Sequence, residues 1–215
     1  MPKDPPQFGP YELLNCYASG IFPMSDGPTE DGLFLVDPED RGIFPLAGLK
    51  ISKSLAKTVR SHRFDIRVDT AFVEMVKKCG APERQGAWIN APIIDLYTQL
   101  HTLGYAHSVE CWYGGKLVGG LYGVSLKGAF FGESMFSHMS NASKTALVHL
   151  VGRLNAGGYT LLDAQFITPH LKTMGAIEIS RDAYHNRLHE ALENDGVFDV
   201  ADYFDFEYAK SVKAR

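Results

Sequence analysis

Three apolar segments separated by glycine-containing turns most strongly restrict the fold of this chain. Segments 107–113 and 116–126 flank a Gly-Gly dipeptide, which is a strong signal for a two-residue β-hairpin. A Lys-Gly pair then turns the chain into segment 129–136. A helical segment, 142–158, and a buried strand, 159–165, follow. We therefore expect an antiparallel meander and then a crossover, within a mixed α/β sandwich around one central sheet.

The first 45 residues differ from the rest of the chain. A short helix over 11–20 is followed by a segment rich in proline, glycine and acidic residues, and then by one short strand broken at Pro38. We expect a small N-terminal subdomain, 1–45, and a larger domain, 46–215. In the larger domain, hairpins followed by a crossover are also typical of acyl-transfer folds of the acetyltransferase (GNAT) type.

Polar residues at helix starts indicate where two further helices begin. Asp69 is a natural N-cap for a helix over 70–80, and Asn90 is one for a helix over 91–104. The remaining elements expected are a helix over 51–63, strands over 64–69 and 176–180, and a helix over 182–194.

Composition excludes several classes of protein. The three cysteines are isolated and lack C-x-x-C spacing, so we expect neither structural zinc nor a disulfide framework, and a reducing cytoplasm is the expected compartment. No apolar run approaches the roughly 18 residues of a membrane span, and the N-terminal segment lacks the apolar core of a signal peptide. The formal net charge of −4 argues against a general nucleic-acid coat but permits a local basic patch.

Asp163 and Gln165 end the apolar strand 159–165 and are separated by two positions, so both side chains are expected on one face. Ligands and catalytic groups of α/β sheets gather beyond the carboxyl ends of strands. A carboxylate and an amide placed there can accept protons and hold an amine or a hydroxyl. The alternative, that Asp163 caps a following turn and Gln165 faces water, is equally compatible with the spacing.

Glu133 interrupts the apolar segment 129–136. An acid inside such a strand must be paired, hydrogen-bonded or functional. Strict alternation places Phe131, Glu133 and Met135 on one face, which as a pocket would suit a ligand with a hydrophobic group and an amine. From the residues alone, a sheet-edge Glu that points into solvent is the alternative.

Two other polar clusters carry weaker signals. A hydrolase triad of Ser134, His138 and Asp163 lacks the second glycine and the helix start that a nucleophile elbow needs. His185 and His189 are four positions apart on a helix but lack a third metal ligand, so no metal site is expected.

Three features bear on binding. Trp88 suits either the core or a stacking surface. Lys53, Lys57 and Arg60 form a basic stripe on one helix face, a pattern that is usually just a solvated face. An acetyltransferase would hold the CoA pyrophosphate on a glycine-containing loop, whereas the corresponding segment here, 137–144, has no glycine. Acetyl-CoA is therefore disfavoured, although the fold is not.

Longer motifs relate the chain to a known family. These motifs are GIFP (20–23), ISKSL (51–55), WI (88–89), LHTLGYAHSVE (100–110), LVGGLYGV (117–124), FGESMFSHMSNASKTAL (131–147), LLDAQ (161–165) and MGAIEI (174–179). Over nearly the whole chain, and most densely over 88–180, they resemble the bacterial leucyl/phenylalanyl-tRNA–protein transferase family.

The resemblance implies an enzyme that moves Leu, Phe or Met from aminoacyl-tRNA to the N-terminal α-amine of proteins beginning with Arg or Lys. The modified end is a degradation signal of the N-degron (N-end rule) pathway. The resemblance also implies an acetyltransferase-like fold for the larger domain. Because the ester is already activated, it implies no cofactor and no metal. The partners would be Leu-tRNA, Phe-tRNA and these proteins, with no membrane, and we expect a cytoplasmic monomer.

The resemblance also assigns roles to particular residues. The family's catalytic pair matches Asp163 and Gln165, with Gln165, polarised by Asp163, taking the proton of the attacking amine and relaying it toward the ribose oxygen. The family's pocket glutamate matches Glu133, which would hold the aminoacyl ammonium group. The other residues implied for substrate binding are Trp88 near the terminal adenosine, Tyr97 on the helix after it, and the apolar Leu121, Phe130, Met135, Leu147, Leu150 and Leu162. Those implied for tRNA binding are Lys53, Lys57 and Arg60.

Departures from the family pattern leave this catalytic pair intact. Met24 and Leu35 stand where tryptophan is usual. The alternative function is a non-catalytic aminoacyl-tRNA or N-degron binding module on the same fold. Because binding alone needs no proton relay, the presence of Asp163 and Gln165 favours the enzyme. An acyl-CoA transferase is disfavoured by the glycine-free loop.

Overall fold

The computed structural model describes residues 8–27, 32–81, 88–200 and 204–214. Residues 1–7, part of the segment in which no signal peptide is expected, lie outside them. Within the described ranges, no helix combines the length and the apolar character needed to cross a membrane.

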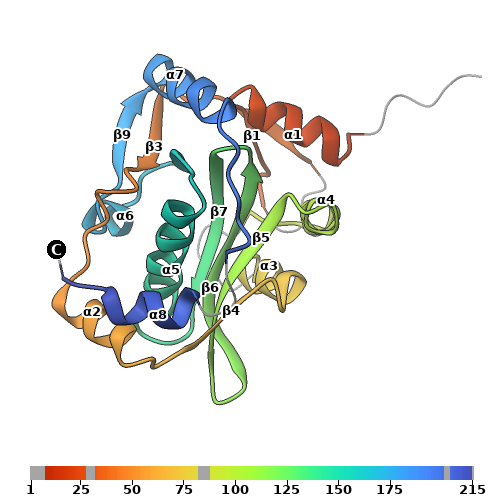
Figure 1. The fold of residues 1–215 in the computed structure, drawn as a ribbon. Coiled ribbons are helices and arrows are strands. Elements are labelled where there is room, and N and C mark those ends of the chain that lie inside the picture. Colours follow the sequence, from red (N-terminus) through yellow and green to blue (C-terminus); the bar gives the residue numbers. More distant parts are fainter. Residues whose placement is uncertain (1–7, 28–31, 82–87, 201–203, 215) are drawn as a thin grey trace, which may run out of the picture.

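A mixed sheet forms the centre of the structure (Figure 1), and the described residues contribute seven strands to it. These are β3 (Asp40–Phe44), β4 (Asp65–Val68), β5 (Ala106–Tyr113), β6 (Lys116–Leu126), β7 (Ala129–Ser137), β8 (Leu161–Gln165) and β9 (Ile177–Ser180). Their order is β4-β5-β6-β7-β8-β3-β9. Neighbours are antiparallel except β7 and β8, which are parallel and joined through α5 (Ala142–Ala156). The predicted meander, crossover and α/β class are thus confirmed.

The N-terminal part of the chain contributes to two sheets. β1 (Phe22–Met24) and β2 (Phe34–Val36) form a separate antiparallel pair. β3 follows them in the chain but lies in the main sheet, between β8 and β9. The segment expected as a small subdomain, 1–45, therefore adds a strand to the sheet formed by later residues. The division of the chain at residue 45 stays a prediction.

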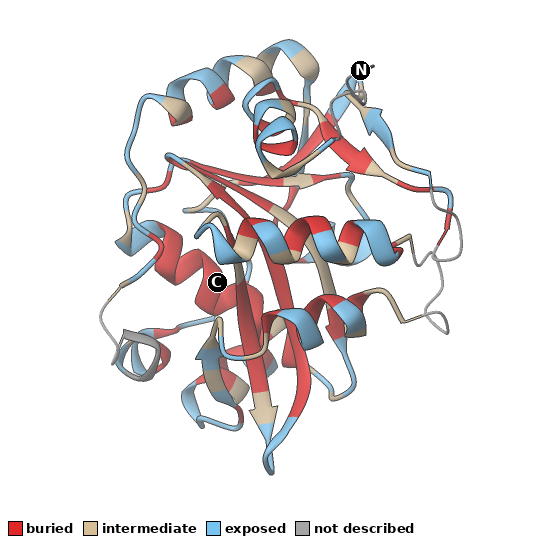
Figure 2. Cartoon of the chain, turned by 90° about the vertical axis from the view of Figure 1, so that its right-hand side faces the viewer, coloured by how far each residue is buried: buried red, intermediate tan, exposed pale blue. Residues whose placement is uncertain are grey.

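Helices cover both faces of the main sheet, so the strands form the middle of three layers (Figures 1 and 2). One apolar core lies between the sheet and a set of helices that includes α5, and the other core lies on the opposite face. The first set is α2 (Lys53–Arg60), α5, the short α6 (Pro169–Thr173) and α8 (Phe204–Ser211). The second set is α1 (Pro10–Ala18), α3 (Phe72–Cys79), α4 (Ala91–Thr102) and α7 (Arg181–Leu192).

Asp69 does not cap α3, contrary to the prediction. The N-cap is Ala71, whose N–H donates to the carboxylate of Glu110 at 2.8 Å. Asp69 has a left-handed backbone, with φ of +58°, and its carboxylate accepts the N–H of Ser108 at 2.7 Å and contacts His107. The pairing of β4 with β5 brings these groups to Asp69, so the carboxylate ties the connecting loop to β5. By contrast, the predicted cap at the start of α4 is confirmed.

β7 contains a β-bulge at Glu133. In the pairing of β6 with β7, Tyr122 lies opposite Ser134, and the next residue, Gly123, lies opposite Gly132. Glu133 is therefore an extra residue in the ladder. Such an insertion bends the strand and redirects the inserted side chain.

The bulge also changes which side chains share a face of β7. Phe130 and Met135 both pack on the α5 side of the sheet, whereas Phe131 and Phe136 pack on the opposite side. The prediction that Phe131, Glu133 and Met135 share a face is therefore wrong. Its physical cause is the extra residue, which shifts the period-2 pattern by one position.

Gly123, on β6, lets β6 and β7 approach each other closely beside the bulge. A Cβ at this position would lie 2.2 Å from the carbonyl oxygen of Phe131 and 2.5 Å from the ring of Phe130. We expect Gly123→Ala to lower the free energy of unfolding by about 1–3 kcal/mol, the usual cost of overpacking. Denaturant unfolding measures this change, and Gly32→Ala is the control, because Gly32 is exposed and no atom of the described residues lies within 4 Å of an added Cβ there. Equal stability of the two variants would contradict the close approach.

Candidate active site

A cavity of about 360 Å³ opens beside the carboxyl end of β8 and the bulge of β7. Its volume lies in the range of small-molecule pockets. Most of the wall is apolar, and the carboxyl and carboxamide groups in it belong to Glu133, Asp163 and Gln165. The larger apolar residues of the wall are Phe22, Met24, Phe44, Trp88, Leu121, Met135, Leu147, Leu150, Leu162, Phe166 and Leu171.

Asp163 is fully buried at this wall. Arg41, on β3, donates two hydrogen bonds to its carboxylate, from Nε at 3.0 Å and from Nη2 at 2.6 Å. The hydroxyl of Tyr184 on α7 donates a third at 2.9 Å, and the backbone N–H of Gln165 donates a fourth at 2.8 Å. The carboxylate is therefore surrounded by donors, which is the condition under which a buried ion pair is tolerated.

Arg41 is itself enclosed by the protein and is only 1% exposed. Its Nη1 donates to the carbonyl oxygen of Gly20 at 2.7 Å. Its guanidinium carbon lies 4.4 Å from the ring centroid of Phe22 and 4.3 Å from that of Tyr184. Burial disfavours the charged form, but the hydrogen bonds and charge of Asp163 outweigh it and raise the pKa of Arg41. One ion pair thus joins β3, β8, α7 and the segment before β1.

The sequence patterns do not identify Arg41 as part of the site. A cation next to the apolar residues of strand 40–44 must find a partner when the strand is buried, and this is the signal that could have found it. Nothing local connects Arg41 with Asp163, which lies 122 positions away in the chain. The contact exists because β3 adds to the sheet beside β8.

Gln165 ends β8 in a left-handed conformation, with φ of +51°, and its side chain lines the cavity. The amide Nε2 is buried and has no hydrogen-bond partner in the described part of the chain. Leaving such a donor without a partner is costly, so this amide is a candidate for ligand binding. Asp163 contacts Gln165 through the backbone N–H, and it therefore fixes the position from which the side chain extends.

Glu133, the extra residue of the bulge, contacts two tyrosines. Tyr17 on α1 donates to Oε1 and Tyr97 on α4 donates to Oε2, both at 2.7 Å. The two tyrosine oxygens lie 2.5 Å apart. Burial raises the pKa of Glu133 to about 7, although the hydrogen bonds from Tyr17 and Tyr97 oppose the shift. Burial also raises the pKa of both tyrosines well above the ordinary value.

Burial favours the neutral form of Glu133, whereas the hydrogen bonds that Tyr17 and Tyr97 donate favour the carboxylate. A bound cation that donates to Glu133 would also favour the carboxylate. Near neutral pH the cluster can therefore exchange a proton for an ammonium group.

The structure brings together most of the residues that the family resemblance assigns to the substrate. Glu133, Asp163 and Gln165 lie on one cavity, as do Trp88 and the apolar residues Leu121, Met135, Leu147, Leu150 and Leu162. Tyr97 reaches the site through its hydrogen bond to Glu133. Phe130 instead lies in the core between the sheet and α5, where it is fully buried. The roles of all these residues stay predictions.

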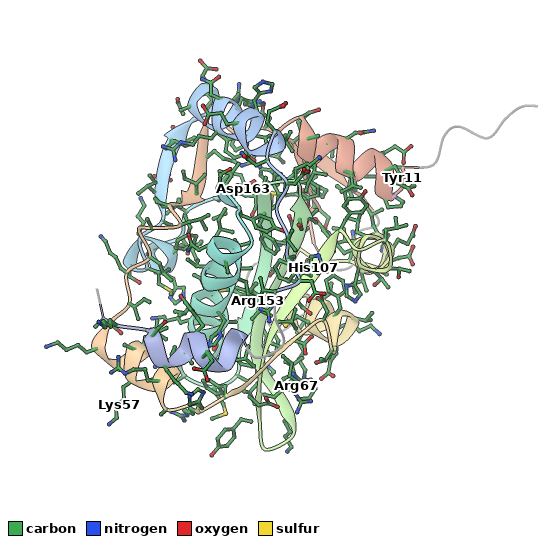
Figure 3. The ribbon with its side chains drawn as sticks, viewed as in Figure 1. Tyr11, Lys57, Arg67, His107, Arg153 and Asp163 are labelled. Atoms are coloured by element: carbon green, nitrogen blue, oxygen red, sulfur yellow. The ribbon has the colours of Figure 1, made fainter. Side chains whose placement is uncertain are left out.

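The basic stripe lies apart from the cavity. Lys53, Lys57 and Arg60 are exposed on α2. Figure 3 shows Lys57 at the periphery below α2, whereas Asp163 lies near α7 at the opposite end of that view. The Nη1 of Arg60 donates to the carbonyl oxygen of Val212 at 2.7 Å, so this side chain also ties α2 to the chain after α8.

The structure supports neither a metal site at the two histidines of α7 nor a hydrolase triad at Asp163. His185 faces Asp37, with Nε2 3.4 Å from the carboxylate. Among the described residues, no three His, Cys, Asp or Glu side chains form a group that could hold a metal ion. The carboxylate of Asp163 is occupied by Arg41, Tyr184 and a backbone N–H, so the arrangement does not match a hydrolase triad with His138.

Comparison with known proteins identifies the family. The model of the family described as "Leucyl/phenylalanyl-tRNA protein transferase" matches residues 43–189. Curated proteins named leucyl/phenylalanyl-tRNA–protein transferase from Phenylobacterium zucineum (strain HLK1) and Maricaulis maris (strain MCS10) are 58% and 57% identical to this chain over 188 and 187 residues. The alignments cover 86% of this chain, and 85% and 87% of the two relatives.

The chain belongs to the leucyl/phenylalanyl-tRNA protein transferase family. The resemblance read from the sequence motifs is thereby confirmed. The region matched by the family model contains Glu133, Asp163 and Gln165 but not Arg41. A solved structure, that of L-PGS from Bacillus licheniformis, is 11% identical, covers 92% of this chain and 62% of its own, and has a TM-score of 0.39. That likeness is too weak to assign a fold to this member of the transferase family.

Arg41→Met removes the cation and leaves the buried Asp163 without its charged partner. We expect the free energy of unfolding to fall by about 3–5 kcal/mol, because an uncompensated charge remains in the interior. Denaturant unfolding at neutral pH measures the loss. Arg67→Met is the control, since Arg67 pairs with Asp65 at 2.7 Å on the surface, where such pairs contribute about 1 kcal/mol or less. Equal losses of unfolding free energy in the two variants would show that Arg41 does not compensate the buried charge of Asp163.

The raised pKa of Glu133 predicts a pH dependence of stability. Its value of about 7 in the folded protein lies above the ordinary 4.5, so between these values the folded state holds the proton more tightly than the unfolded chain does. The stabilising contribution is fully present below pH 4.5 and is lost as the pH rises through about 7.

Glu133→Gln abolishes this titration and provides the measurement. From about pH 5 to about pH 8, the unfolding free energy of the wild type should decline relative to that of Glu133→Gln. Glu74→Gln, at a half-exposed position on α3, is the control and should show no such trend. A constant difference between wild type and Glu133→Gln over this range would be incompatible with the raised pKa.

Proposed function

We propose that this protein transfers Leu, Phe or Met from aminoacyl-tRNA to the N-terminal α-amine of proteins that begin with Arg or Lys. The observation that carries the proposal is one cavity on which an apolar wall, Glu133 and the pair Asp163 and Gln165 meet. Family membership supports the reaction class, because the curated relatives are named leucyl/phenylalanyl-tRNA–protein transferases. The product would carry a new apolar N-terminus, a signal for degradation through the N-degron pathway in the cytoplasm.

The apolar wall of the cavity would hold the aminoacyl side chain. Its central residues are Leu121, Met135, Leu147, Leu150 and Leu162. Walls of this kind separate similar apolar side chains by only about 1–3 kcal/mol, which supports acceptance of Leu, Phe and Met at one site. The unbranched, polarisable side chain of Met135 can adapt to ligands of different shape.

Glu133 would hold the α-ammonium group of the aminoacyl ester. The other carboxylate on the described wall, that of Asp163, is neutralised by Arg41 at 2.6 Å. Among the described residues, the hydrogen-bond partners of Glu133 are the neutral hydroxyls of Tyr17 and Tyr97, and none of them is a cation. It would release its proton when the ammonium group binds, because a nearby cation favours the carboxylate.

Gln165 would act on the reacting amine. The amine nitrogen attacks the ester carbonyl carbon, a C–N bond forms, and the bond to the ribose oxygen breaks. The proton lost by the amine ends on that oxygen, so the exchange balances without a further reactant. Gln165 Oε1 can accept a hydrogen bond from the amine, and the unpartnered Nε2 can donate to an oxygen of the ester. Asp163 would position Gln165 through its backbone N–H.

Trp88 and α2 would bind the nucleic acid. Trp88 lines the cavity, and an indole ring there suits stacking on the terminal adenosine. Lys53, Lys57 and Arg60 are exposed and would meet phosphates of the acceptor stem. The protein would act as a monomer without a cofactor.

We also propose an acetyltransferase-like (GNAT) fold for residues 46–215. The antiparallel order β4-β5-β6-β7, followed by the parallel pair β7–β8 joined through α5, supports this assignment. An aminoacyl ester would take the place that an acyl thioester has in such folds. β3, from the N-terminal segment, would then be an addition beyond β8.

A transfer assay tests the proposed function. The protein is incubated with labelled Leu-tRNA or Phe-tRNA and with peptides that begin with Arg or Lys, beside peptides that begin with Asp or Glu. We expect label only on the basic peptides. Label on the acidic peptides would overturn the acceptor assignment. Binding of the tRNA without label on any peptide would favour the non-catalytic binding module.

Gln165→Asn is expected to lower kcat about 10²–10⁴-fold while aminoacyl-tRNA binding stays nearly unchanged. Asn withdraws the amide by one methylene and tolerates the left-handed backbone at this position. Gln99→Asn is the matched control, because Gln99 is on α4 and hydrogen-bonds to Asp95 on the surface. Loss of binding with unchanged turnover per bound tRNA would contradict the role of Gln165.

A further inference from the structure

One basic side chain lines an edge of the cavity and a second lies one helix turn from another lining residue; among the described residues neither has an acidic partner. His170, on α6, is one of the residues that line the cavity. Lys144 lies three positions before Leu147, a cavity-lining residue of α5, and residues at this spacing share a helix face. Burial and then the charge of Lys144 lower the pKa of His170. Within the described ranges, neither side chain takes part in an ion pair.

The start of α5 adds to the positive potential at this edge. The N-terminus of a helix is positive and normally attracts acidic side chains. The first turn of α5 has no acidic residue, and Lys144 occupies it instead. Lys144 and the helix dipole therefore repel each other, and a bound anion would lower the energy of the arrangement.

This edge lies between the cavity and the basic face of α2. Asn141, which precedes α5, donates from Nδ2 to Oγ1 of Thr58 on α2 at 3.2 Å. Lys57, the neighbour of Thr58, is exposed. In Figure 1, α2, α5 and α6 lie on the same side of the sheet. Basic residues are therefore present at Lys57 on α2, at Lys144 in the first turn of α5 and at His170 on the cavity wall.

We propose that Lys144 and His170 bind the phosphodiester immediately before the terminal adenosine of aminoacyl-tRNA. The single-stranded 3′ end then runs from the basic face of α2, across the start of α5, into the cavity. This inference rests on the proposed function and names the surface that the tRNA uses.

The chemistry of the two side chains suits one phosphate. A lysine ammonium group supplies a point charge with three donors, and an imidazole supplies an N–H. A phosphate held at the edge of the cavity fixes the register of the strand without reading a base. It would thus place the ester beside Gln165, whose amide Nε2 has no partner in the described structure.

The test compares two stable donor analogues that differ by this phosphate. One probe is adenosine that carries a phenylalanyl group in amide linkage at the 3′ position. The second probe carries the same group on a CpA dinucleotide. Calorimetry measures the Kd of each probe for the wild type, Lys144→Gln and His170→Gln. Lys172→Gln is the matched control, because Lys172 is on the same helix as His170 but pairs with Glu178 at 3.3 Å.

We expect Lys144→Gln to weaken binding of the dinucleotide about 10-fold, as for loss of one charged hydrogen bond, and to leave the adenosine probe unchanged. His170→Gln should act in the same direction, and Lys172→Gln should change neither probe. With Phe-tRNA, Lys144→Gln should raise KM with little change in kcat. It should also reduce the slope of log K against log salt by about 0.7, the value for one phosphate of a single strand.

Several outcomes would overturn the inference. These are equal weakening of both probes by Lys144→Gln, no effect on either probe, or an equal effect of Lys172→Gln on the dinucleotide. In each case continued transfer from Phe-tRNA by the wild type leaves the proposed function standing. Failure of the wild type to bind either probe and to transfer from Phe-tRNA would overturn both.

Discussion

The buried ion pair between Arg41 and Asp163 holds together the elements that form the cavity. Its two charges are out of contact with water, so each depends on the other and on the surrounding hydrogen bonds. The bidentate geometry fixes β3 against β8, and Tyr184 brings α7 to the same carboxylate. The third nitrogen of the guanidinium group, Nη1, donates to the carbonyl oxygen of Gly20, so the segment before β1 is also fixed. Phe22, two residues later, then lies both against Arg41 and on the cavity wall.

The two carboxyl groups of the cavity have different surroundings and therefore different chemistry. Asp163 contacts a cation within the protein, which satisfies its charge before any ligand arrives. Glu133 contacts neutral hydroxyls, and burial raises its pKa to about 7. When the surroundings of two acids move their pKa values apart, one acid can supply a fixed charge and the other an exchangeable proton. In this site the first would position Gln165 and the second would receive the ligand's ammonium group.

Elements governed by local rules were predictable from the sequence. The Gly-Gly hairpin is one example, since both glycines have positive φ, 56° and 73°, which few other residues adopt without strain. Asn90 is another, because an N-cap depends on the side chain and the next three residues. The predictions that failed depended on distant neighbours. Asp69 contacts β5 instead of capping α3. The inserted residue Glu133 shifts the pattern of β7 because of how β7 pairs with β6.

The sequence by itself determined the meander, the crossover and the helix starts, because these follow from periodicity, turn residues and caps within a few positions. Its motifs also determined the family, and they marked Asp163, Gln165 and Glu133 as candidates. Only the tertiary structure decided what each candidate touches. Arg41 and Tyr184 reach Asp163 from distant parts of the chain, and Tyr17 comes from α1 to meet Glu133. Such contacts depend on how strands and helices add to the sheet, which no local pattern encodes.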